Sequence, residues 1–130
     1  MTAHVIPYSY AEAKQAIERA SRNQQQAEQL LRQAATKYAE AERQYRKALA
    51  LRIVELHAEG VAWTVCQDIA RGDNHVADLR YERDVAEGVR EAQREASFRH
   101  AADRRELEQL VDWSKRAPDG ADGFEVRRVA

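Results

Sequence analysis

Apolar residues in the first half of the chain recur at alternating intervals of four and three, the heptad pattern of a helix that packs along one side. Alanine occupies one of the two repeating positions six times in succession, and larger side chains fill most of the other. Alanine is abundant in this chain, so chance placement is the alternative. A position that is always small lets two helices approach closely, and we expect an oligomer seam. Its members are Ala13, Ile17, Ala20, Ala27, Leu31, Ala34, Tyr38, Ala41, Tyr45 and Ala48.

The limits of this helix can be predicted from its flanking residues. Ser9 followed by Glu12 forms a capping box, in which each side chain satisfies a free amide of the other residue. No proline or glycine occurs between Tyr10 and Glu59, and Gly60 then supplies a stop position. We therefore expect a long helix over about 10–59, preceded by an N-terminal arm, 1–8.

A dense apolar zone follows the seam, where the apolar stripe shifts as a stutter or a change of partner would produce. This zone predicts a compact core at a joint between two long helices. Its members are Leu49, Leu51, Ile53, Val54, Leu56, Val61, Trp63, Val65 and Ile69.

The joint itself contains further helix signals. Thr64 with Gln67 predicts a second capping box and Gly72 a stop, which gives a short helix over about 65–71. Asp73 or Asn74 then caps a second long helix over about 75–116. The residues 117–130 are expected to form a flexible tail, and ordering of this tail on binding, with Phe124 and Val126 as anchors, is a hypothesis.

These elements predict an all-α fold, an elongated antiparallel helical hairpin over 9–116 with a short helical joint. Two helices bury one narrow face each, which is marginal for a chain that is 33% charged and 7% aromatic. Pairing into a four-helix arrangement would bury a second face, and we expect a homodimer.

The charge balance argues against a dedicated nucleic-acid binder, because 21 lysines and arginines face 22 acidic residues. A local basic stretch, Arg43, Arg46 and Lys47, is interleaved with Tyr38 and Tyr45 and could contact phosphates. The tyrosines lie on the seam, which favours a place in the core over base stacking. Nucleic-acid contact is therefore the alternative hypothesis.

The environment of the protein follows from what the chain lacks. Cys66 is the single cysteine, which excludes an intrachain disulfide and suggests the cytoplasm. No apolar run is long enough for a membrane span, and Met1 to Tyr10 lacks the layout of a signal peptide. We expect a cytoplasmic protein.

Candidate chemistry is weak along the whole chain. No phosphate-binding glycine loop, paired cysteines or nucleophile elbow occurs. His100 and Asp103 share a helix face, but no third metal ligand accompanies them. The acidic row Glu87, Glu91 and Glu95 alternates with arginines, which is typical of a solvated helix face. We expect no enzyme activity, no cofactor, no metal and no small-molecule substrate.

Three residues of the joint are candidate contacts for a protein partner: Trp63, Arg71 and Asp73. Trp63 is the leading candidate if the joint core does not use it. Arg71-Gly72-Asp73 spells an adhesion tripeptide, but a helix stop followed by a helix cap explains it.

The segments from Asp68 to Asp73, Val76 to Arg80 and Glu82 to Glu87 together resemble a pattern in small all-helical proteins of tailed phages and prophages. Members of that group are often encoded near recombination or replication genes. The resemblance implies a phage context and no residue-level active site.

Our leading hypothesis is a non-enzymatic protein–protein interaction module acting on a host or phage protein, in DNA metabolism or as an inhibitor of host defence. The alternatives are a nucleic-acid-binding accessory of recombination or replication, and a scaffold or chaperone of virion assembly.

Overall fold

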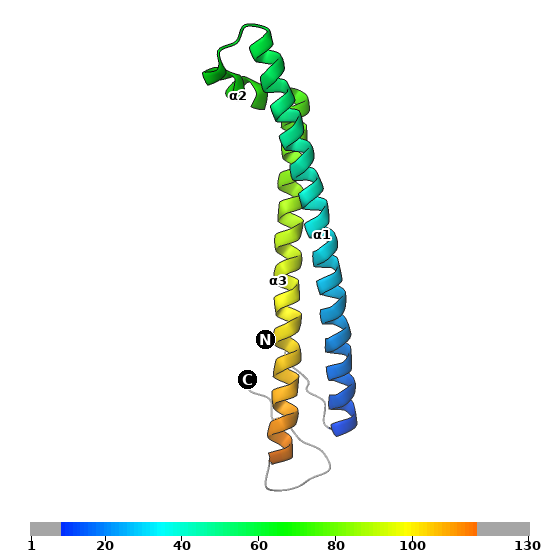
Figure 1. The fold of residues 1–130 in the computed structure, drawn as a ribbon. Coiled ribbons are helices and arrows are strands. Elements are labelled where there is room, and N and C mark those ends of the chain that lie inside the picture. Colours follow the sequence, from blue (N-terminus) through cyan, green and yellow to red (C-terminus); the bar gives the residue numbers. More distant parts are fainter. Residues whose placement is uncertain (1–8, 117–130) are drawn as a thin grey trace. The chain divides into compact units, whose positions relative to one another are not determined.

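The computed structural model describes residues 9–116 and places three helices in them: α1 (Tyr10–Ala58), α2 (Trp63–Arg71) and α3 (Asn74–Arg116) (Figure 1). The two long helices pack against each other, with α2 between them in the chain. This confirms the predicted all-α helical hairpin. The predicted arm, 1–8, and tail, 117–130 with Phe124 and Val126, lie outside the described residues.

The signals around α1 act as predicted at both ends. The Glu12 amide donates a hydrogen bond to Ser9 Oγ at 3.1 Å, which satisfies one of the free amides of the first turn. After Ala58, Gly60 adopts a φ of +100°. Glycine reaches this conformation at little cost in free energy because it has no Cβ. Its amide donates to the His57 carbonyl at 3.0 Å. The chain therefore leaves the helix at the glycine.

The prediction of a capping box at the start of α2 is wrong. This helix begins at Trp63, so Thr64 already lies in its first turn and cannot cap it. Its N-cap is Ala62, with an extended backbone (φ −63°, ψ 141°) and no side-chain hydrogen bond. For α3 the cap is Asp73, whose Oδ1 accepts from the amides of His75 and Val76 at 3.1 and 3.3 Å.

The chain divides into two compact units, each of which combines a segment of α1 with a segment of α3. Within the described residues, the first unit comprises 9–29 and 95–116. Its described core consists of Ala13 and Val111, with Ile17 and Leu110 packed against them. Gln24, which occupies the heptad position between Ala20 and Ala27, accepts a hydrogen bond from Arg104 at 3.4 Å.

The second unit, Leu30–Arg94, contains the joint and a second core. Leu56, Cys66 and Ala70 form its centre, and three partly buried residues of the predicted zone pack against them. The Cys66 thiol donates to the Val61 carbonyl at 3.4 Å, which ties α2 to the loop before it. The three surrounding residues are Leu49, Ile53 and Val61.

The predicted joint core is too large. Five of its nine members are exposed by 45% or more, because a single row of contacts covers only one side of each helix. A helix repeats every 3.6 residues, so side chains two or five positions before Leu56 cannot share its face. The exposed members are Leu51, Val54, Trp63, Val65 and Ile69.

The alanine seam is buried within a single copy of the chain. Ala13, Ala20, Ala27 and Ala34 are all buried, as is Tyr45. The remaining seam residues are half-buried: Ile17, Leu31, Tyr38, Ala41 and Ala48. Because the hairpin itself covers these side chains, a second copy would have to use other apolar residues. The oligomer stays a prediction.

Candidate functional site

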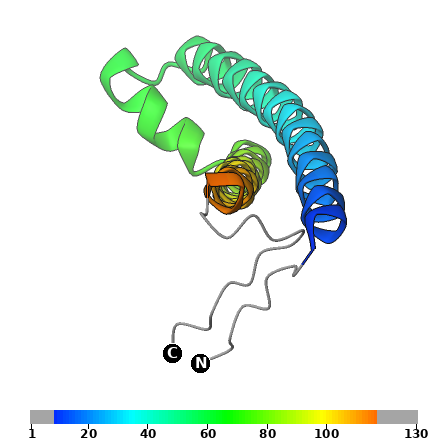
Figure 2. The same cartoon turned by 90° about the horizontal axis from the view of Figure 1, so that it is seen from below.

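The apolar arc of α2 is wider than the core that covers it. At 3.6 residues per turn, Cys66 and Ala70 mark the middle of the arc, and both are fully buried. Val65 and Ile69 lie together on one edge, with 45% and 48% of their surfaces exposed. In the end-on view one side of α2 faces away from both long helices (Figure 2). The joint therefore presents an apolar surface next to a buried core.

Trp63 lies on the other edge of this arc and is only partly used by the joint. Its ring stacks on His57, with centroids 3.6 Å apart and an interplanar angle of 16°. His57 in turn is fixed by a 3.0 Å hydrogen bond between Nδ1 and the Val61 carbonyl. The tryptophan is still 58% exposed, so one face is held and surface remains for a partner.

The other two predicted partner contacts differ from each other. The Arg71 side chain is exposed and forms no ion pair with any residue of 9–116. Asp73 is half-buried and already engaged, because its carboxylate caps α3 and its Oδ2 lies 3.4 Å from Arg52 Nε. Arg71 is therefore available to a ligand, whereas the Asp73 carboxylate is used within the chain.

The predicted nucleic-acid stretch is largely neutralised on its own helix. Arg46 Nε lies 2.6 Å from Glu42 Oε1, and an Arg43 nitrogen lies 3.6 Å from Glu40 Oε2. Within the described residues Lys47 has no ion pair. The three basic residues lie on one stretch of α1, but two of them, Arg43 and Arg46, form ion pairs with neighbouring glutamates.

The tyrosines of that stretch are held by arginines of α3. The Arg83 guanidinium lies 4.5 Å from the centre of the Tyr45 ring, and Arg90 lies 4.1 Å from that of Tyr38. Tyr45 is only 6% exposed. An arginine of α3 thus covers one face of each ring, and the burial of Tyr45 agrees with a place in the core.

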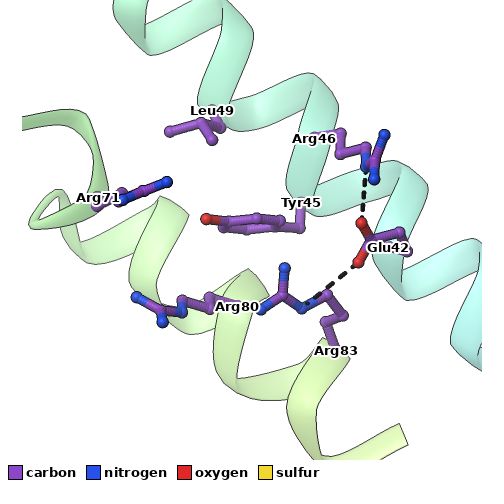
Figure 3. Close-up of a pocket in the computed structure, with 7 residues that line it drawn as sticks. All are labelled: Glu42, Tyr45, Arg46, Leu49, Arg71, Arg80 and Arg83. Atoms are coloured by element: carbon purple, nitrogen blue, oxygen red, sulfur yellow. Dashed lines mark hydrogen bonds and ion pairs between the residues drawn. The ribbon is translucent and has the colours of Figure 1, made fainter. Parts of the chain in front are cut away.

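Four arginines from three helices gather around Tyr45 in an open hollow of about 290 Å³ (Figure 3). Three of these arginines come from outside α1: Arg71 ends α2, and Arg80 and Arg83 lie on the first turns of α3. We call this the arginine hollow. Its lining residues are Glu42, Tyr45, Arg46, Leu49, Arg71, Arg80 and Arg83.

Sequence reasoning missed the arginine hollow as a site. It assigned Arg46 to nucleic acid and Arg71 to a protein partner, and it gave no role to Arg80 or Arg83. The spacing of Arg80 and Arg83 places them on one helix face, but only the folded joint brings that face to Arg46 and Arg71.

Ion pairs hold Arg83 in place within the hollow. Its Nε lies 3.5 Å from Glu42 Oε2, and its Nη2 lies 2.9 Å from Asp84 Oδ1. Partial burial acts to lower the pKa of the guanidinium, but the hydrogen bond to Asp84 and the charges of Asp84 and Glu42 outweigh it. The net result raises the pKa of Arg83 above its ordinary value, so the group stays charged.

A second, apolar hollow of about 360 Å³ lies between α1 and α3 in the same unit. Tyr81, Val85 and Val89 follow one another at four-residue spacing along α3, and each is exposed by nearly half or more. We call these three residues the α3 row. Ala34 and Lys37 of α1 form the opposite wall.

The remaining candidates stay apart. Glu87, Glu91 and Glu95 are exposed, as expected of a solvated face, and His100 is half-buried beside an exposed Asp103. Residues 9–116 hold no group of three or more His, Cys, Asp or Glu side chains that could bind a metal. None of the helices in that range is both long and apolar enough to cross a membrane.

Comparisons with protein-family models, with curated proteins and with solved structures gave no match.

Proposed function

We propose that this chain is a non-enzymatic protein–protein interaction module in which α2 presents its apolar edge to a protein partner. One observation carries the proposal: Val65 and Ile69 stay exposed along one edge of a short helix that is anchored by the fully buried Cys66 and Ala70. Exposed apolar side chains on a fixed support lose little conformational entropy on binding, which is what binding hot spots require.

The stacked Trp63 offers a second candidate contact, on the other edge of the arc. Trp is enriched among residues that dominate binding energies, and this one is already held against His57. A partner can cover its remaining surface without first having to fix the ring. We propose that Val65 and Ile69 form the partner surface of α2, and that Trp63 is a separate partner contact on the other edge of the arc.

The proposed partner is a cytoplasmic protein of a phage or of its host, in DNA metabolism or host defence. The resemblance of 68–87 to small helical phage proteins supports this choice, as does a single cysteine that is buried as a free thiol.

A pull-down of the tagged full-length chain from an extract of the cells that express it tests this surface. After nuclease treatment, the chain should retain a stoichiometric protein, and Val65→Ser with Ile69→Ser should lose it. As a matched control, Leu51→Ser with Val54→Ser removes a similar exposed apolar surface from α1 and should retain the partner. Equal recovery by the α2 variant and the unchanged chain would overturn the assignment.

We further propose that the chain forms a homodimer through the α3 row. The row and the apolar hollow beside it form an apolar surface that water covers in a single copy. Packing of the same face from two copies would produce a symmetric four-helix arrangement.

Sedimentation equilibrium tests the homodimer. The unchanged chain should sediment at twice the monomer mass, and Val85→Asp with Val89→Asp should convert it to monomer. Val54→Asp changes an exposed valine on α1, outside the α3 row, and should leave the dimer intact. A dimer that survives charges in the α3 row would exclude this interface.

A further inference from the structure

The arginine hollow has an uneven charge balance. Arg46 and Arg83 both face Glu42, at 2.6 and 3.5 Å, and Asp84 adds a second carboxylate beside Arg83 at 2.9 Å. Four guanidinium groups therefore meet two carboxylates, and two positive charges remain unbalanced.

The two unbalanced groups are Arg71 and Arg80. Neither forms an ion pair with any other residue among those the structure describes, and both side chains are exposed. They come from different helices, and the Tyr45 hydroxyl points to the side of the hollow where both guanidinium groups lie (Figure 3). Leu49 closes one side with an apolar wall. The hollow thus offers two charged donor groups and one hydroxyl donor in one place.

This arrangement matches a compact anion with two charges. A guanidinium group presents a planar fork of N–H donors that binds two oxygens at once, which suits a tetrahedral phosphate. Two unbalanced positive charges would be neutralised by a phosphate monoester, which carries between one and two negative charges at neutral pH. A carboxylate would leave one of them unbalanced.

A nucleic-acid strand fits the same surroundings less well. A strand needs a basic track along its length, because each phosphodiester carries one charge. Here carboxylates stand among the arginines: Glu42 lies in the lining, and Asp84 stands beside Arg83 at 2.9 Å. The excess of positive charge is local, so a single anionic group is favoured over a polymer.

We propose that the arginine hollow is a binding site for one phosphate monoester, with Arg71 and Arg80 as its direct ligands and the Tyr45 hydroxyl as a further donor. Arg46 and Arg83 are positioning residues, because Glu42 links both of them and Arg83 packs over the Tyr45 ring. The phosphate group can belong to a free phosphorylated molecule or to a phosphorylated side chain of a protein, since both present the same dianion.

The test is a titration followed by NMR of the arginine Nε–H groups in the full-length chain. The probes are inorganic phosphate, a short phosphoserine peptide and a short single-stranded DNA, each compared with chloride at equal ionic strength. Phosphate and the phosphopeptide should shift the Arg71 and Arg80 signals saturably. Tighter binding of the peptide would assign the group to a protein side chain, and equal binding would assign it to a free phosphorylated molecule.

Variants separate the site from general charge effects. Arg71→Gln with Arg80→Gln should weaken phosphate binding at least about tenfold, because two charge-assisted contacts are lost. Arg43→Gln changes an exposed arginine of α1 outside the hollow and should leave the affinity unchanged. Arg71→Lys with Arg80→Lys keeps the charge and the fold, and it should still lose affinity because lysine lacks the planar fork.

Three outcomes would overturn the site. The first is a phosphate response no larger than that of chloride. The second is unchanged affinity in the glutamine variant, provided that its helix content matches that of the unchanged chain. The third is tighter binding of the DNA than of the phosphopeptide, which would indicate a strand-binding surface.

Discussion

Truncation of Leu56 should loosen α2 without unfolding the long helices, and this prediction follows from the small core of the joint. Leu56 is 4% exposed and is the largest side chain among the three buried members of that core. Replacement of a buried leucine by alanine typically costs about 2–5 kcal/mol, according to how far the neighbours collapse into the space.

The magnitude should fall in the lower half of that range. Leu49, Ile53 and Val61 are only partly buried and can move toward the vacated space. We therefore expect Leu56→Ala to cost about 2–3 kcal/mol. The matched control is Leu51→Ala, the same chemical change on the same helix at a side chain that is 62% exposed. It should change stability by less than about 0.5 kcal/mol.

Amide hydrogen exchange at Cys66 and Ala70 measures the local stability of α2 directly, because both residues lie on the buried side of that helix. A loss of about 2–3 kcal/mol should speed their exchange about 30- to 150-fold if α2 opens on its own. Leu51→Ala should leave their rates almost unchanged. If the two variants gave the same exchange rates, the joint core would not be what fixes α2.

The remaining predictions concern the backbone, the seam and the cap, all measured by urea unfolding. Gly88→Ala should raise stability by about 0.5–1 kcal/mol, since an added Cβ meets nothing within 4 Å in mid-helix. Gly60→Ala should lower it, because the φ of +100° strains any side chain. Ala27→Leu should cost about 1–3 kcal/mol by overpacking the buried seam, whereas Ala39→Leu, on the exposed side of α1, should be nearly neutral. Asp73→Ala should cost about 1 kcal/mol through the lost cap of α3. An Ala27→Leu variant of unchanged stability would contradict the close packing described for the seam. A Gly60→Ala variant of higher stability would contradict the backbone conformation described for Gly60.

Local signals predicted most of the fold. Ser9 and Asp73 cap their helices as expected. The oxygen of a short polar side chain just before a helix can accept hydrogen bonds from the free amides of the first helical turn. The heptad spacing also identified four buried alanines, Ala13, Ala20, Ala27 and Ala34, since a helix repeats its faces whatever its partner is.

The composition of the joint core and the arginine hollow could not be predicted in the same way. An apolar run indicates that a core exists, but it does not indicate which of its side chains the short helix can cover. The exposure of Leu51 and Ile69 could therefore not be predicted. The hollow depends on contacts between residues distant in sequence, as between Arg83 and Glu42 at 3.5 Å. No spacing rule along one helix can reveal such a pair.

Site-specific photo-crosslinking tests the central claim, that α2 presents a partner surface, most directly. Benzoylphenylalanine would replace Ile69 in the full-length chain, and in a control chain it would replace Ala39, which is also exposed. After irradiation in cells that express the protein, the probe at Ile69 should form one discrete adduct with another protein, and the probe at Ala39 should not. No adduct at Ile69, or the same adducts at both positions, would contradict a partner surface on α2.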